Sequence, residues 1–543
     1  MMKRVLTICF VGLVFIAEAQ LPKVLSDESV YLPDFSYAGY HNGERALPEP
    51  VGRVLQAIDF GVVSNDGLDD SQALLEVMRK AHEMKEAVVV QLPAGKIILS
   101  EIIYIERSNL VLRGAGSGTG GTEIFVPRPM SYFDDPPALA ELREYLVALD
   151  KRQREKENNI DLPFSQYAWS GGVIWTRKAG VRTKAYLEKY DQPPSILASL
   201  ERGKRGEKVI STTSINGLKV GDVVQIEWYN QEGENGSLIQ EMYGENGFKI
   251  GSHHWSYPEH ALVQQQTTVT KIAGKTVTIK DPLLLDIKQA WTPKMVEWQY
   301  LEEVGIEHLK ITFPMAPNIA HHVEEGYNGI YLTRLFNGWV KDVKIENADS
   351  GILTEETANV TIQHIETSGE KVAHYSVSMS GVHNVLVKNL SVKNRVRHPL
   401  SFNTFSTKSV YTSCQVDQEP ILDQHSGANH QNLFDNITVK VTLNEDRAYG
   451  LFEGGGAGYW KPSHGAYTTM WNIRVDFQNG FDSTQPAVLN GMSDGPGARL
   501  IGIHGNLPIE IKYEPNPYIE MTNKELVETP SLYHYQLRKR TVK

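Results

Sequence analysis

Residues 337–392 read NGWVKDVKIENADSGILTEETANVTIQHIETSGEKVAHYSVSMSGVHNVLVKNLSV and repeat one short pattern. Two mostly apolar residues separated by one residue recur in it, each pair after an Asn-marked turn. The same doublet occurs on both sides of this stretch, so that the full series is Leu309-x-Ile311, Val343-x-Ile345, Ile365-x-Thr367, Leu390-x-Val392, Cys414-x-Val416, Ile437-x-Val439 and Ile473-x-Val475. The steps between first members are 34, 22, 25, 24, 23 and 36 residues. Repeats of this length indicate a stacked architecture.

The alternation within each doublet is typical of a strand, in which every second side chain faces the core. We therefore predict an all-β chain folded as a right-handed parallel β-helix, with one strand of each coil carrying one doublet. The two long steps would be coils that contain loop insertions. A coiled ladder of this kind buries its apolar core and leaves a long outer face, which suits an extended polymer.

The N-terminal part of the chain carries a family resemblance. The segments DFG (59–61), NDGLDDSQALLEV (65–77), VVVQLPAGKIILS (88–100) and NLVLRGAGSGTGGT (109–122) resemble the opening of pectate-lyase-like right-handed β-helix proteins. The resemblance is specific over residues 55–125 and implies a helix that caps the open N-terminal end of the coil. Asp69 or Asp70 is placed to cap this helix, whose apolar residues recur at helical spacing.

The chain divides into four expected parts. Residues 1–19 resemble a secretory signal, because Lys3 and Arg4 precede an apolar run and a small-residue cleavage site, Ala17-x-Ala19. We expect an extended arm at 20–54, the β-helix at 55–510 with a helical insertion near 130–205 and a β-rich insertion near 207–290, and a tail at 511–543. A short helix beginning at Ser531 would close the C-terminal end of the coil.

Bulk composition narrows the function. The net charge of −11 argues against nucleic acid as a partner, although a local cationic patch still suits an anionic sugar. The chain has two cysteines, and Cys9 leaves with the signal, so Cys414 has no partner for an internal disulfide. We predict a buried thiol at Cys414, a bacterial protein exported to the periplasm or secreted, no membrane span, and a monomer.

Most of the 17 histidines lie within residues 253–464, and several fall in adjacent coils. Successive coils carry the motifs Arg395-x-Arg397-His398, His425 with His430, and a Gly-rich loop followed by Tyr459-Trp460-Lys461-x-x-His464. Because the steps between His398, His425 and His464 approximate one coil each, these side chains should meet on one face, with strands about 4.8 Å apart. The segments RVRHPLSF, LDQHSGANHQNLFDN and PSHGAYTTMWN resemble loops of polysaccharide-lyase-like proteins of marine bacteria that degrade algal polymers such as ulvan and alginate.

Imidazole, guanidinium and ammonium groups together suit β-elimination beside a carboxylate. Such a reaction needs a cation to neutralise a uronate, a base for its C5 proton and an acid for the leaving oxygen. We therefore predict a carbon–oxygen lyase acting on a uronic-acid-containing poly- or oligosaccharide. The predicted catalytic residues are His398, His425, His430, Lys461 and His464, and the predicted substrate-binding residues are Arg395, Arg397, Tyr459, Trp460, Glu325 and Asn328.

Several alternatives remain open at this point. The same groups would serve an oligosaccharide dehydratase that eliminates water at a chain end. A glycoside hydrolase would need a carboxylate pair from Glu325, Asp423 and Glu453, and a non-catalytic carbohydrate-binding β-helix would need only aromatic platforms. We predict no certain cofactor, although Asp417, Glu419 and Asp423 would suit Ca²⁺. The pairs His253-His254 and His321-His322 could bind a metal with Glu325, but they do not meet a zinc spacing, so the sequence assigns no metal site.

Overall fold

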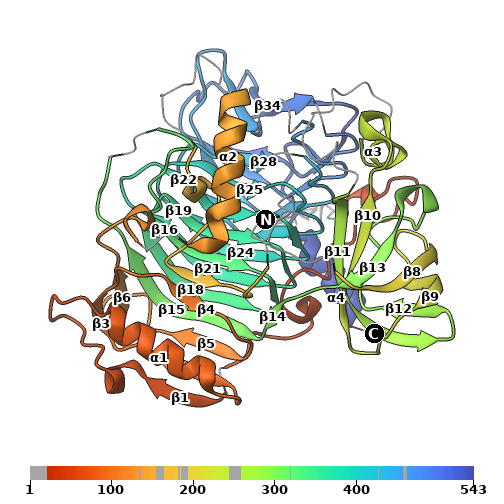
Figure 1. The fold of residues 1–543 in the computed structure, drawn as a ribbon. Coiled ribbons are helices and arrows are strands. Elements are labelled where there is room, and N and C mark those ends of the chain that lie inside the picture. The colour runs from red at the N-terminus through yellow and green to blue at the C-terminus, as the bar shows by residue number, and fades with distance from the viewer. Residues whose placement is uncertain are drawn as a thin grey trace, which may run out of the picture.

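The computed structural model describes residues 21–49, 51–133, 136–153, 164–181, 184, 194–243, 259–317, 320–425, 427–455, 461–493 and 495–542. The expected signal segment and residues 253, 254, 459 and 460 lie outside the described residues. The described chain is a right-handed parallel β-helix with a capping helix and with helical and β insertions, as the sequence predicts (Figure 1).

The largest parallel sheet follows the length of the coil. It begins with β1 (Arg53–Gln56), β2 (Val88–Gln91), β5 (Leu110–Arg113), β15 (Val304–Thr312), β18 (Trp339–Glu346), β21 (Thr361–Ser368) and β24 (Leu386–Val392), with β3 (Gly95–Ile98) and β6 (Thr122–Phe125) alongside. After β24 it continues as two ladders. One contains β26 (Val410–Thr412), β29 (Leu433–Asp435), β32 (Thr469–Trp471), β35 (Arg499–Ile501) and β38 (Tyr518–Glu520), and the other β27 (Gln415–Val416), β30 (Thr438–Val441), β33 (Arg474–Phe477) and β36 (His504–Gly505).

The doublets lie in register across this sheet. Leu309 pairs with Val343, Val343 with Ile365, and Ile365 with Leu390. The second members pair in the same way, ending with Val439 beside Val475. These side chains are buried, and so is Cys414 at the same position, where burial raises the pKa of its thiol to about 12. The predicted role of the doublets as core strands is therefore confirmed.

A left-handed residue precedes every doublet and explains how the chain enters it. The residue before each first member has φ between 51° and 58°: His308, Asp342, His364, Asn389, Ser413, Asn436 and Asn472. Asparagine tolerates this conformation better than most residues. A second set of bends at Asn337, Asn359 and Asn384 also has positive φ. The asparagines of the repeat thus mark the corners of the coil.

A second parallel sheet forms the face of the coil that concerns function. It contains β4 (Ile103–Ile105), β7 (Ile174–Thr176), β16 (Asn328–Thr333), β19 (Ser350–Glu355), β22 (Ala373–Met379), β25 (Val396–Phe402) and β28 (Leu422–Gln424). Two short sheets complete the coil. They are β14 (Leu301–Glu302), β17 (Leu335–Phe336), β20 (Thr357–Ala358) and β23 (Val382–His383), and near the C-terminal end β31 (Ala448–Phe452), β34 (Ala487–Ser493) and β37 (Ile509–Glu514).

Helix α1 (Ser71–Glu83) covers the N-terminal end of the coil. Its buried face, which includes Leu74 and Val77, joins the main core. Asp70 occupies the N-cap position, while the carboxylate of Asp69 accepts a hydrogen bond of 2.8 Å from the backbone N–H of Ser71. Both acidic residues therefore act at the start of the helix.

The β-rich insertion is a closed antiparallel barrel beside the coil (Figure 1). Its strands are β8 (Ile196–Arg202), β9 (Val209–Ile215), β10 (Val223–Tyr229), β11 (Ala261–Ala273), β12 (Thr276–Ile279) and β13 (Lys294–Glu297). The barrel has its own core, which extends to Phe405 and Ala428 of the coil. Helix α3 (Ser237–Tyr243) belongs to it, and helix α2 (Ala140–Gln153) forms part of the earlier insertion.

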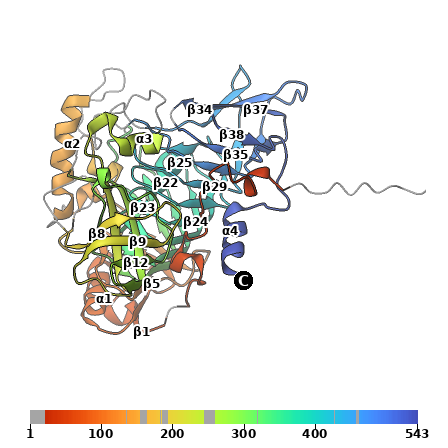
Figure 2. The same ribbon diagram turned by 90° about the vertical axis from the view of Figure 1, so that its right-hand side faces the viewer.

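The N-terminal arm and the C-terminal helix α4 (Leu532–Thr541) pack together on the side of the coil (Figure 2). The backbone N–H of Leu532 donates to Asp435, and the Tyr533 hydroxyl donates to the carbonyl of Ala38. The sequence suggested that this helix would close the C-terminal end. It lies along the side instead, because Leu532 and Tyr533 pack against apolar side chains of the arm and of the ladder that contains β26, β29, β32 and β35. No helix of the described residues has the length and apolar character needed to cross a bilayer.

Candidate functional site

Five histidines gather along the second sheet, and we call them the imidazole cluster. The ring centroid of His321 is 3.6 Å from that of His322 and 4.6 Å from that of His374. The centroids of His374 and His398 are 5.4 Å apart, and those of His398 and His425 are 4.5 Å apart. His374 belongs to β22 and His398 to β25, and His425 follows β28. The loop between β15 and β16 brings His321 and His322 back onto the same face.

Asp423 lies between two members of the cluster. Its carboxylate oxygens are 3.4 Å from Nδ1 of His398 and 3.5 Å from Nδ1 of His425, and it also accepts from the hydroxyl of Ser401. Burial alone would raise the pKa of Asp423, but the two imidazoles outweigh it and hold the pKa below its usual range. Asp423 is therefore an ionised carboxylate that lies between the two rings without a hydrogen bond to either.

The cluster is electrostatically unusual because its imidazoles are buried together. Burial, assisted by the charge of His374, lowers the pKa of His322 to about 3. Burial also lowers the pKa of His321, His374 and His425. Glu324 lies 3.2 Å from Nδ1 of His374, and burial raises its pKa. At neutral pH His321, His322, His374 and His425 are therefore neutral and present lone pairs as well as N–H groups.

Two cations border the cluster. Arg397 is exposed one residue before His398, and its charge acts on His321 and His374. Lys461 is half-buried, and its charge acts on His425. Several buried polar atoms between these cations have no hydrogen-bond partner among the described residues, including both ring nitrogens of His398, Nδ1 of His425 and Oδ1 of Asp423. Buried polar atoms are normally satisfied, so their concentration here indicates a place for a polar ligand.

The backbone of one loop, at Gly454 and Gly455, lies against the rings of both His464 and His425. A Cβ built on Gly455 would be 1.9 Å from Cε1 of His425, and one built on Gly454 would be 3.1 Å from Nε2 of His464. Nδ1 of His464 is 2.7 Å from the hydroxyl of Tyr513. The structure therefore brings His398, His425, Lys461 and His464 to one face, and these two glycines allow the loop to approach both rings.

The other predicted residues lie elsewhere. His430 faces the barrel side of the coil, where its Nδ1 is 3.0 Å from the carbonyl of Ala428. Asn328 is fully buried and donates to backbone carbonyls of Tyr167, Ser170 and Gly171, so it holds a loop in place. Arg395 pairs with Glu419.

Glu325 is half-buried, and its backbone carbonyl accepts from Ser131. The carboxylates considered for Ca²⁺ do not converge in the described structure. Asp417 pairs with Lys440, Glu419 with Arg395, and Asp423 with the imidazoles. Two other groups have ligand atoms within 4.8 Å of one another: His321, His322 and His374, and His398, Asp423 and His425.

Sequence reasoning did not include His374 and Glu324. A usable signal existed for His374, because it precedes His398 by 24 residues, which is one coil. The register between the two strands is 23 residues and pairs Tyr375 with His398, so His374 lies one position away from the partner of His398. Glu324 had no comparable signal, because it lies in a loop whose direction the repeat does not encode.

Comparison with known proteins gives matches only at the level of structure. No family model and no curated protein matches the chain. A tailspike protein from Pseudomonas phage LKA1 is similar over 86% of this chain and 78% of its own, with 11% identity and a TM-score of 0.46. An exopolygalacturonase from Thermotoga maritima is similar over 88% and 93%, with 10% identity and a TM-score of 0.33. The A-module of a mannuronan C-5 epimerase from Azotobacter vinelandii is similar over 86% and 98%, with 11% identity and a TM-score of 0.33. At such low identity, function has to be inferred from the residues of the site itself.

Proposed function

We propose that this protein is a carbon–oxygen lyase that performs β-elimination on a uronic-acid-containing poly- or oligosaccharide. The observation that carries the proposal is the group formed by His398, Asp423 and His425 with Arg397 and Lys461 at its border. It combines a base, an acid and cations on one face of a fold with a long outer surface. The distances of 3.4 Å and 3.5 Å to Asp423 are within the range of catalytic contacts that tighten when substrate binds.

The reaction needs three groups from the protein, and this chain has a residue for each. Arg397 or Lys461 pairs with the uronate carboxylate, which makes the C5 proton more acidic. His425 is the proposed base: a proton on Nδ1 facing Asp423 leaves the lone pair of Nε2 to accept the C5 proton. The electrons of the C5–H bond form the C4=C5 double bond, and those of the C4–O bond leave with the oxygen. His398, which has to carry a proton on each ring nitrogen at this step, donates its Nε2 proton to this oxygen and becomes neutral.

A chain-end dehydratase is the closest alternative. The leaving group is then water, and every proton transfer stays the same. One contact favours it: the hydroxyl of Tyr243 on α3 accepts a hydrogen bond of 3.1 Å from the backbone N–H of Ala428, three residues after His425. This hydrogen bond holds the barrel beside the site. A barrel in that position suits a substrate whose sugar chain ends at the site.

Glycoside hydrolysis fits less well. It requires two carboxylates that reach the substrate from either side of the bond. Of the candidate carboxylates, Asp423 is buried between two imidazoles and is not presented as an acid or nucleophile to a sugar. A pair would then have to come from Glu325, which is half-buried, and Glu453, which is exposed.

The test is a product assay with matched variants. The mature protein is incubated with uronate polymers and their oligosaccharides, and the ultraviolet absorbance of the new double bond is followed. Mass spectrometry separates chain cleavage from loss of water. His425→Ala and Lys461→Ala should abolish the absorbance change, while His430→Ala, on the barrel side of the coil, should retain activity. Full activity in His425→Ala would place the reaction elsewhere.

A further inference from the structure

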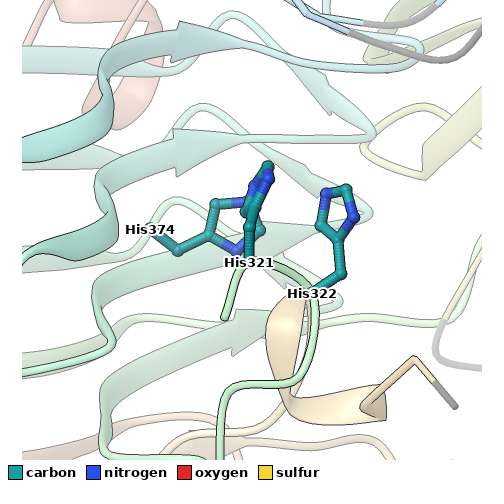
Figure 3. A group of neighbouring side chains, drawn as sticks. All are labelled: His321, His322 and His374. Atoms are coloured by element: carbon teal, nitrogen blue, oxygen red, sulfur yellow. The ribbon is translucent and has the colours of Figure 1, made fainter. Parts of the chain in front are cut away.

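We propose that His321, His322 and His374 form a binding site for one divalent transition-metal ion of the zinc type. Their ring nitrogens lie within 4.8 Å of one another, and Figure 3 shows the three rings side by side. Nε2 of His321 and Nε2 of His374 are 3.0 Å apart. With zinc–nitrogen bonds of about 2.0–2.1 Å, two ligands of a tetrahedral site are separated by about 3.3 Å, so only a small adjustment is needed.

The donor set has the chemistry that such an ion prefers. Imidazole nitrogen suits zinc, copper, nickel and iron, whereas calcium and magnesium prefer oxygen. Two ring nitrogens that face each other at 3.0 Å share at most one proton. A cation bound by these two nitrogens replaces that proton, and the nitrogen of His322, within 4.8 Å of both, supplies a third ligand.

The surroundings hold the rings in a ligating orientation. Oε1 of Glu324 is 3.2 Å from Nδ1 of His374, on the side of the ring opposite the proposed ion. A carboxylate on the outer nitrogen of a metal-binding histidine fixes its tautomer and strengthens the ligand. The ring of Tyr375 stacks on His374 with centroids 4.1 Å apart, and Trp169 lies 4.9 Å from His322. Glu324 thus acts as a positioning residue.

Three histidines leave a fourth position for water or a ligand oxygen, the arrangement found in catalytic rather than structural zinc sites. His321 and His322 are both partly exposed, so this position is reachable. It is close to the proposed acid, because the ring centroids of His321 and His398 are 5.9 Å apart. If the proposed function holds, a carboxylate oxygen of the substrate fits there; the binding of the ion itself does not depend on that function.

The experiment is a titration of the chelator-treated full chain with Zn²⁺ by isothermal calorimetry, with bound zinc then counted by elemental analysis. We expect one ion per chain. His321→Ala and His322→Ala should lose this binding, and because both residues lie in a partly exposed loop the test does not depend on altering the fully buried His374. Glu324→Gln should weaken binding by about 10–100-fold.

Two controls make the result decisive. His364→Ala removes an exposed histidine of β21 outside the cluster and should bind zinc like the wild type. His425→Ala alters the neighbouring group and should also retain the ion. A wild-type protein that binds no zinc, or a His321→Ala variant that binds it as tightly as the wild type, would overturn the assignment. Zinc binding without elimination would support this inference and remove the proposed function, and elimination by a protein that binds no zinc would do the reverse.

Discussion

Replacing Asp423 by asparagine should nearly abolish activity while changing the shape of the site very little. In the wild type both carboxylate oxygens are used, one facing Nδ1 of His398 and the hydroxyl of Ser401, the other facing Nδ1 of His425. An asparagine offers one oxygen and one NH₂ group. Whichever way it is turned, one of the two imidazoles meets a donor and must move its proton to Nε2.

At His425 this change removes the Nε2 lone pair that accepts the C5 proton. At His398 it removes the second ring proton, so the ring is a poor acid. General acid–base catalysis contributes about 10²- to 10⁴-fold to a rate. At about 1.4 kcal/mol per tenfold change, the barrier should rise by about 3–5 kcal/mol. The initial rate of double-bond formation is the assay, measured with thermal unfolding so that a loss of activity is assigned to a folded protein.

Asp417→Asn is the matched control, because Asp417 pairs with Lys440 away from the imidazole cluster. It should keep the wild-type rate. An Asp423→Asn variant that is folded and reacts within tenfold of the wild type would refute the role given to this carboxylate.

Three further outcomes are expected. Gly455→Ala should reduce kcat by about 10²-fold in the elimination assay, because its Cβ would displace His425 and a shift of about 1 Å has that effect; an unchanged rate would show that His425 is not confined by this loop. Ile365→Ala should lower the free energy of unfolding in urea by about 2–5 kcal/mol, whereas Ile58→Ala, at a side chain that is 60% exposed, should change it by less than about 0.5 kcal/mol. Burial lowers the pKa of His430 to about 4 in the folded protein, against about 6.5 unfolded, so the unfolded chain binds more protons between these values and stability should fall by about 3 kcal/mol as the pH drops from 6.5 to 4. Urea unfolding across this range should show a shallower pH dependence in His430→Asn, and an identical slope would contradict the assignment.

The coil was predictable from sequence because each doublet encodes both a strand and its register. Leu309, Val343 and Ile365 are equivalent in the repeat, and the structure pairs them directly. His398 and His425 do meet, as expected for adjacent coils, but the strands are in register at 22 residues and pair Ser401 with Asp423, so the 27-residue spacing alone did not fix the contact.

What spacing does not encode is the corner between two strands. His430 is five residues from His425, yet it faces the barrel because the chain turns between them. The return of His321 and His322 onto the second sheet was equally hidden, since an inserted loop carries no periodicity. Closely spaced residues can therefore belong to different faces, while residues one coil apart share one.

The most direct test of the central claim is the fate of the C5 hydrogen during turnover. A uronate oligosaccharide carrying deuterium at C5 is incubated with the protein, and the masses of the products are measured by mass spectrometry. Elimination with His425 as base predicts an unsaturated product that has lost the deuterium, at a rate slower than with the unlabelled substrate, and no such product with His425→Ala. Cleaved products that keep the deuterium and contain no double bond would contradict the account.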